Sequence, residues 1–325
     1  MNVKSFLFCL LLYPTLATAQ GTLPQLAADI AMPGLKGRID HFGVDAKRHR
    51  LYVAALGNDT VEVLDLGAGK RARSLDGFGE PQGIVHVSET GRVFVANGSS
   101  NRVDILDAES LVLLGHVNGL EDADNLRYDA QARKVYVGYG SGALRVLDAM
   151  TGASSGDIAL PGHPESFQLE KSGTRIFVNI PTAGRISVVD RVKQAVVAGW
   201  SVPAAANFPM ALDEAGRRLF VAARAPAVLL VYDIDSGRVV ARLPIGGDSD
   251  DLFYDGTRKR VYVVCGEGRV DVLRQDDPDH YVLEGTVKTA PRARTGLLVP
   301  EDGALYVAAP ASGASPARVL VYKLR

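Results

Sequence analysis

A short apolar strand motif recurs seven times along this chain at an almost constant interval, and this repeat limits the possible folds more than any other feature. Two copies are Leu51-Tyr52-Val53-Ala54 and Val93-Phe94-Val95-Ala96-Asn97. The copies begin at Leu51, Val93, Val135, Ile176, Leu219, Val261 and Leu305, so successive starts lie 42, 42, 41, 43, 42 and 44 residues apart. A period of about 40–45 residues with four strands per unit is typical of a β-propeller blade. The sequence therefore predicts a seven-bladed β-propeller.

Each unit contains the pattern of four strands joined by polar turns. In the second unit we expect strands at 83–87, 93–97, 103–107 and 111–117, with Gly, Asp, Asn and Ser in the turns. The third strand ends in an aspartate in the first five units and lacks it in the last two. No segment has a 3.6-residue apolar period of useful length. The predicted fold class is therefore all-β.

The two ends of the chain predict how the ring closes. The last unit ends at Arg325 after three strands, and an additional strand is expected near residues 26–32. If this N-terminal strand pairs with the third strand of the last unit, it completes that blade and removes two exposed sheet edges. We therefore expect deletion of residues 20–32 to lower the melting temperature or to abolish soluble expression.

The N-terminus has the composition of a secretory signal peptide over residues 1–19. Lys4 provides the positive charge, residues 6–12 are apolar, and Ala17-Thr18-Ala19 forms a small-residue cleavage site. The mature chain, residues 20–325, is then expected to be a single propeller domain that is periplasmic or secreted, and monomeric. Only Cys265 remains in it, so no intramolecular disulfide is expected.

Composition and missing motifs exclude several classes of function. The formal net charge is −1, which does not favour nucleic acid or an anionic membrane, and no later apolar run is long enough to span a membrane. Nucleic-acid binding through basic turns on one face stays a minor alternative. No Cys-x-x-Cys-His motif is present for covalent haem, and no Gly-x-Ser-x-Gly elbow for a serine hydrolase.

The repeated strand pairs resemble those of a known family. Tyr-Val-Ala/Thr-Asn strands followed by Val-x-Val-Leu/Ile-Asp strands resemble the YVTN-repeat, YncE-like β-propellers of bacteria, and residues 93–97 with 103–107 match best. The resemblance covers the mature chain, although only one unit contains Val-Ala-Asn. It implies an exported seven-bladed propeller with a binding role, including nucleic-acid or cell-envelope partners in some members. WD repeats are excluded because their Gly-His and Trp-Asp pairs are missing.

The loops that lead into the innermost strands predict a site at one mouth of the central channel. Eleven residues before each repeated strand lie Asp40, Gln82, Asp124, Glu165, Phe208, Asp250 and Arg294. A purely structural loop should repeat the same turn chemistry, whereas this position holds five different residue types in the seven blades. We predict a polar, acid-rich ligand site formed by Asp40, His41, Glu80, Asp124, Asn125, His163, Glu165, Asn207, Asp250, Asp251, Arg292 and Arg294. The alternative is that these side chains only cap inner strands.

Three kinds of ligand fit these residues. The carboxylates suit a divalent cation such as Ca²⁺, and the histidines would also admit Zn²⁺. Arg292 and Arg294 could instead clamp a carboxylate or phosphate. The metal candidates are Glu80, Asp124, Glu165 and Asp250. The first hypothesis is a binding module that takes a small molecule or an envelope protein. The alternative is a divalent-metal-dependent lactonase or related hydrolase, with an aspartate or a histidine, such as His41 or His163, as the base.

Overall fold

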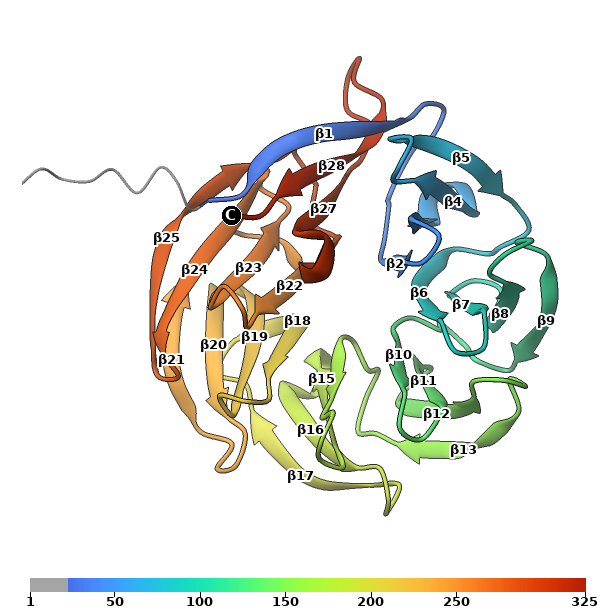
Figure 1. Cartoon of the computed structure of the whole chain (residues 1–325). Coiled ribbons are helices and arrows are strands. Elements are labelled where there is room, and N and C mark those ends of the chain that lie inside the picture. The colour runs from blue at the N-terminus through green and yellow to red at the C-terminus, as the bar shows by residue number, and fades with distance from the viewer. Residues whose placement is uncertain (1–22) are drawn as a thin grey trace, which may run out of the picture.

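The computed structural model describes residues 23–325, and the signal peptide expected at residues 1–19 lies outside them. Within this range, 28 strands form seven four-stranded antiparallel sheets. The sheets stand as blades around a central axis, with one strand of each blade nearest the axis (Figure 1). Three short 3-10 helices, Leu56–Asn58, Pro181–Ala183 and Pro300–Asp302, are the only helices among these residues. The predicted all-β, seven-bladed fold is confirmed.

Each blade runs from the axis outward in chain order, except the last. The first four blades are β2 (Phe42–Asp45), β3 (Arg50–Ala55), β4 (Thr60–Asp65), β5 (Lys70–Leu75); β6 (Pro81–Val87), β7 (Arg92–Asn97), β8 (Arg102–Asp107), β9 (Leu113–Asn118); β10 (Leu126–Asp129), β11 (Lys134–Tyr139), β12 (Ala143–Asp148), β13 (Ser154–Ala159); and β14 (Phe167–Leu169), β15 (Arg175–Ile180), β16 (Arg185–Asp190), β17 (Ala195–Ser201). The strands predicted for the second unit therefore exist, with ends that differ by one or two residues.

The remaining blades follow the same order until the chain ends. They are β18 (Ala205–Asp213), β19 (Arg218–Ala225), β20 (Ala227–Asp233), β21 (Val239–Pro244); β22 (Ser249–Asp255), β23 (Arg260–Cys265), β24 (Arg269–Asp277), β25 (His280–Lys288); and β26 (Gly296–Val299), β27 (Ala304–Ala309), β28 (Ala317–Lys323) with β1 (Gln25–Met32). The outermost strand of the last blade is thus the first strand of the described chain.

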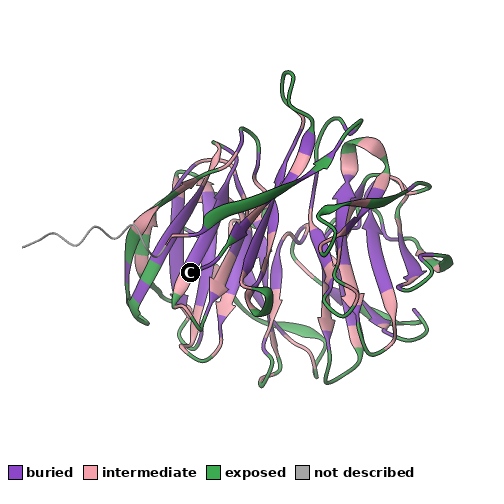
Figure 2. Cartoon of the chain, turned by 45° about the horizontal axis from the view of Figure 1, so that its top comes forward, coloured by how far each residue is buried: buried purple, intermediate pink, exposed green. Residues whose placement is uncertain are grey.

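The repeated motif is apolar throughout because each of its faces packs against a different neighbouring blade. In β3, Leu51 and Val53 pack in a cluster with the last blade, whereas Tyr52 and Ala54 pack with the second blade. Successive side chains of a strand point to opposite faces, so a strand that is buried on both faces must be apolar at every position. Among residues 23–325, the core consists of seven such clusters, one between each pair of adjacent blades. Figure 2 shows the buried interior strands and the exposed turns.

The N-terminal strand closes the ring as predicted. β1 pairs antiparallel with β28, and Ile30 and Met32 lie opposite Val319 and Ala317. Ile30 and Met32 are both buried, although most of β1 is exposed (Figure 2). β1 and β28 run side by side at the periphery of the last blade (Figure 1). The last blade is therefore built from both ends of the described chain.

The aspartate that ends the third strand caps the turn into the fourth strand. In the second blade, Asp107 Oδ1 accepts hydrogen bonds from the backbone N–H groups of Glu109 and Ser110 at 3.1 and 2.8 Å. Asp65, Asp148, Asp190 and Asp233 make the equivalent contact. The last blade has Lys323 here, because its next strand comes from β1 and no hairpin needs a cap. In the sixth blade the strand is longer and Asp277 is the cap.

The hydrogen bonds that Asp107 accepts lead to a first testable prediction. Asp107→Ala is expected to lower the melting temperature by about 2–4 °C, because two backbone N–H groups and the Ser110 hydroxyl lose their acceptor. Lys323→Ala is the matched control at the same position of the repeat, and its melting curve should coincide with that of the wild type. Circular dichroism melts measure both. Equal melting temperatures for Asp107→Ala and the wild type would show that the cap is not stabilising.

Candidate ligand site at the channel mouth

The loops at the mouth share one backbone shape although their side chains differ. Five equivalent loop residues have left-handed backbone angles, with φ between 48° and 65°: Glu80, Asp122, Ala206, Asp248 and Arg292. Residues with a side chain rarely adopt this region. Its recurrence indicates that the blade repeat dictates the backbone of these described loops and leaves their side chains free to vary. These five loops therefore share a structural turn, and the side chain at this position varies from blade to blade.

His41 joins side chains from three blades. Its Nδ1 lies 3.2 Å from Asp251 Oδ2, and its Nε2 lies 3.5 Å from Asn125 Nδ2 and 3.8 Å from Asp40 Oδ1. Asp251 lies in β22, the inner strand of the sixth blade, and Asn125 directly precedes β10, the inner strand of the third. The structure thus brings together four of the predicted residues, from positions up to 210 residues apart.

The surrounding carboxylates hold His41 in its charged form. Burial lowers the pKa of His41, but the carboxylates of Asp251 and Asp40 outweigh this effect and raise it to about 10. An imidazole with that pKa is protonated at neutral pH, so it does not accept a proton there. His41 is therefore a fixed cation of the site, and the general-base role considered for it from the sequence is not available near neutral pH.

Asp250 is the centre of a second group of charges. Arg224 Nη2 lies 2.6 Å from its Oδ1, and Arg294 Nε lies 3.0 Å from its Oδ2. Arg38 approaches Asp250 at 3.8 Å and Asp40 at 3.0 Å. Burial raises the pKa of Asp250, and the guanidinium groups of Arg224 and Arg294 act against this effect. Asp250 is thus already engaged by basic side chains of the protein.

Asp124 and Glu165 differ from Asp40, Asp250 and Asp251 because neither has a basic partner. Among residues 23–325, no Lys, Arg or His nitrogen lies within ion-pair distance of either carboxyl group, and Asp124 Oδ1 is buried without a hydrogen-bond partner. Burial raises the pKa of Asp124 to about 7, against the nearby charge of His41. Burial, together with the charge of Asp250, raises the pKa of Glu165 to about 7. Both carboxyl groups therefore keep a proton to a higher pH than an exposed acid does.

Four predicted residues lie outside this network of contacts. Glu80 is exposed at the rim, and His163 Nδ1 lies 2.6 Å from the carbonyl oxygen of Gly140. Asn207 is fully buried and donates a hydrogen bond from Nδ2 to Asn179 Oδ1 at 3.1 Å. Arg292 is exposed and donates to the carbonyl of Ala311 at 2.7 Å. Arg292 does share a cavity of about 240 Å³ with Arg294, but Arg294 is paired there with Asp248 at 3.0 Å.

The metal candidates do not form a ready-made coordination site. Within the described range, no group of three or more His, Cys, Asp and Glu side chains is arranged to hold a metal ion. The four candidates Glu80, Asp124, Glu165 and Asp250 are thus not gathered as a ligand set, and Asp250 instead contacts arginines. The lactonase alternative gains no support from these contacts.

Three arginines that shape this site, Arg38, Arg127 and Arg224, were left out of the predicted set. Arg224 contacts Asp250 at 2.6 Å and lies 4.3 Å from the ring centre of Phe208. It stands five residues after the start of the repeated strand, where the other six units have Leu56, Gly98, Gly140, Pro181, Gly266 and Pro310. A charged residue at a position that is uncharged in the other six units is the feature that could have identified Arg224 from the sequence. Arg127, in inner strand β10, was missed because we compared the mouth loops and not the strands that follow them.

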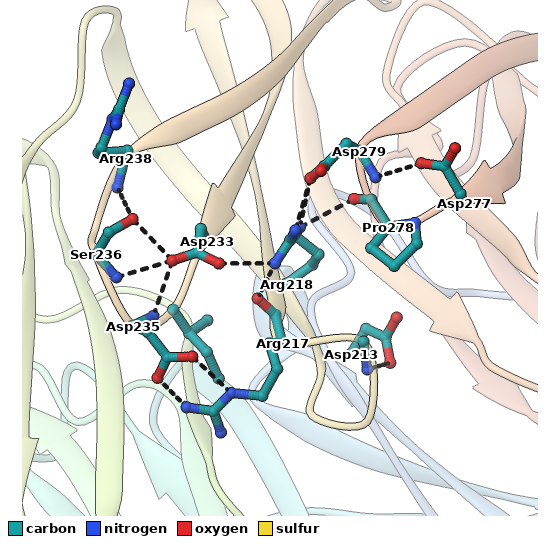
Figure 3. Close-up of polar contacts among 12 residues, drawn as sticks. Asp213, Arg217, Arg218, Asp233, Asp235, Ser236, Arg238, Asp277, Pro278 and Asp279 are labelled. Atoms are coloured by element: carbon teal, nitrogen blue, oxygen red, sulfur yellow. Dashed lines mark hydrogen bonds and ion pairs between the residues drawn. The ribbon is translucent and has the colours of Figure 1, made fainter.

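The basic turns on the opposite face have acidic partners. Arg218 lies between Asp233, at 2.8 Å, and Asp279, at 2.6 Å, and Arg217 pairs with Asp235 (Figure 3). Arg48, Arg175 and Arg258 pair in the same way with Asp45, Glu170 and Asp255. These turns present mixed charge rather than a continuous basic patch for a polyanion.

Comparisons with known proteins support the architecture. No protein-family model and no curated protein matches the chain, and none of the helices in residues 23–325 has the length and apolar character that a membrane crossing needs. A chain of hydrazine synthase from Kuenenia stuttgartiensis has a TM-score of 0.75 at 15% identity, covering 84% of this chain and 94% of that one. A chain of the mitotic checkpoint complex has a TM-score of 0.80 at 13% identity, covering 100% and 99%. At such low identity these likenesses show the β-propeller fold alone.

Proposed function

We propose that this protein is an exported β-propeller binding module that takes a small ligand with a cationic group, such as a primary amine, at the acid-rich mouth of its channel. The observation that best supports this proposal is that Asp124 and Glu165 have no basic partner among the described residues. Other charges of the mouth are already matched, as Asp251 contacts His41 and Asp250 contacts Arg224. An ammonium group would supply the missing partner.

The protonation of these two acids supports a cationic ligand. A carboxyl group whose pKa is about 7 carries only a partial charge at neutral pH. A bound cation favours the ionised form and lowers both pKa values, so binding near pH 7 should release protons. The site would therefore bind an amine more tightly as the pH rises from 6 to 8, until the amine itself loses its proton.

The structure favours a small molecule over an envelope protein as the partner. Asp124 is only 7% exposed and Glu165 is partly buried, so a flat protein surface would not reach both carboxyl groups. Export, a periplasmic or secreted location and a monomeric state belong to the same proposal. Export and this location are supported by the signal-peptide pattern at residues 1–19 and by the resemblance to YVTN-repeat, YncE-like propellers.

Calorimetry on the mature chain tests this proposal. We expect 1,4-diaminobutane to bind at pH 7 with proton release, measured from titrations in two buffers of different ionisation enthalpy. Asp124→Asn and Glu165→Gln should each weaken binding about 10- to 100-fold, because each removes a charge-assisted contact. Glu121→Gln is the matched control, since Glu121 is an exposed acid of the same loop.

Two results would contradict the proposal. One is a wild-type protein that binds neither 1,4-diaminobutane nor 1-aminobutane at millimolar concentration. The other is an equal loss of affinity in Glu121→Gln and Asp124→Asn, which would indicate general electrostatic attraction rather than a defined site.

A further inference from the structure

A ring of inner-strand residues lines the channel below the mouth. Eight residues before each repeated strand lie Gly43, Val85, Arg127, Gln168, Ala211, Phe253 and Leu297. All except Ala211 border a cavity of about 310 Å³ in the channel. Arg127 is the one charged residue in this ring, and its blade differs in that respect from the other six.

Arg127 has no carboxylate partner in the described chain. Its Nη1 donates to the carbonyl oxygen of Leu126 at 2.7 Å, its Nη2 donates to Ser166 Oγ at 3.3 Å, and the guanidinium lies 5.4 Å from the ring centre of Phe167. These bonds leave other N–H donors of the guanidinium unused among residues 23–325. Burial lowers the pKa of Arg127 against the charges of Asp251 and Asp124, but an arginine stays protonated at neutral pH.

The ionisable residues that line this cavity leave one positive charge in excess. His41 and Arg127 are cationic, whereas burial lowers the pKa of His86 and keeps it neutral. Asp251 is the one acid of the lining, and it contacts His41 at 3.2 Å and accepts the N–H of Gly296 at 2.9 Å. A buried cation without a partner is costly, so an anion in this cavity would be bound favourably.

A second cavity, of about 440 Å³, also borders Arg127 between the third and fourth blades. Its acids are engaged elsewhere, since Asp129 pairs with Arg191 and Glu170 pairs with Arg175. Arg127 therefore has no carboxylate partner on this side either.

The rest of the channel lining selects the kind of anion. Most of the wall is apolar, from Val44, Ile84, Val85, Leu126, Phe253 and Leu297, with amide groups from Asn125 and Gln168. A cavity of this size, apolar with few polar groups, is typical of a small-molecule site. A guanidinium pairs with a carboxylate through parallel hydrogen bonds. We propose that the channel binds a small apolar monocarboxylate, with its carboxylate on Arg127 and its body against Val85, Phe253 and Leu297.

This second site is independent of the amine site, so separate probes test it. Calorimetry at pH 7 should show that wild-type protein binds hexanoate at least about tenfold more tightly than hexanamide, its neutral analogue. Arg127→Met should abolish this preference. Arg242→Met is the matched control, because Arg242 lies on outer strand β21. Asp124→Asn should lose amine binding and still bind hexanoate. A wild-type protein that binds hexanoate but no amine would count only against the proposed function.

A second variant keeps the inference testable if Arg127→Met fails to fold. Val85→Phe narrows the cavity and keeps Arg127, so it should weaken hexanoate binding while acetate binding changes less than twofold. Equal affinity of the wild type for hexanoate and hexanamide would overturn the inference, as would unchanged hexanoate binding in folded Arg127→Met. A wild-type protein that binds no carboxylate would overturn it as well.

Discussion

A chain that lacks residues 23–32 is expected to accumulate as insoluble protein, or to melt at least about 10 °C below the intact mature chain. The deletion removes β1, which pairs along β28 from Gln25 to Met32. It also removes Ile30 and Met32 from the cluster between the last and first blades. Each buried side chain of this size stabilises the fold by about 2–4 kcal/mol, and the uncovered edge of β28 is open to intermolecular pairing.

A pair of substitutions separates packing from chain length in this experiment. Ile30→Ser with Met32→Ser should reproduce most of the loss of melting temperature, whereas Leu26→Ser should not, because Leu26 is 57% exposed. A peptide of residues 23–32, added during refolding, should restore part of the soluble yield. An unchanged melting temperature in the deleted chain would refute the closing role of β1.

Asp124→Asn is expected to stabilise the protein at pH 8, unlike most substitutions of a buried residue. Burial raises the pKa of Asp124 from 3.8 to about 7. The folded state therefore binds the proton more tightly than the unfolded state, and the free energy of unfolding falls as the pH rises between about 4 and 7. This loss amounts to about 4 kcal/mol, at about 1.4 kcal/mol per pKa unit, and it is shared in part with Glu165.

Urea unfolding of the wild type and Asp124→Asn at pH 4, 6 and 8 measures this effect. The two proteins should have similar free energies of unfolding at pH 4, and the variant should be more stable at pH 8. Asp40→Asn is a control for which we expect the opposite effect. Asp40 contacts Arg38 at 3.0 Å and His41 at 3.8 Å, so this variant should be less stable than the wild type at pH 8. Destabilisation of both variants at pH 8 would mean that Asp124 has a partner in solution.

The sequence by itself determined the architecture of this protein and its closure. The period near 42 residues and the continuous apolar strands follow from burial on both faces of each blade, which is a requirement that every blade meets locally. The missing aspartate of the last unit also has a local cause, since Lys323 stands where no hairpin follows. The repeat likewise aligned the mouth loops, and it placed Asp40, His41, Asn125 and Asp251 in what became one network.

Only the tertiary structure decided which of these residues act together. Asn207 occupies a mouth loop in the repeat, yet the register of β18 shifts between Asn207 and Met210, and the amide is buried against Asn179. The charge state of His41 depends on Asp251, 210 residues away, and that of Asp250 on Arg224 from another blade. Burial and the distance between charges set these properties, and both arise only when seven blades bring their loops to one axis.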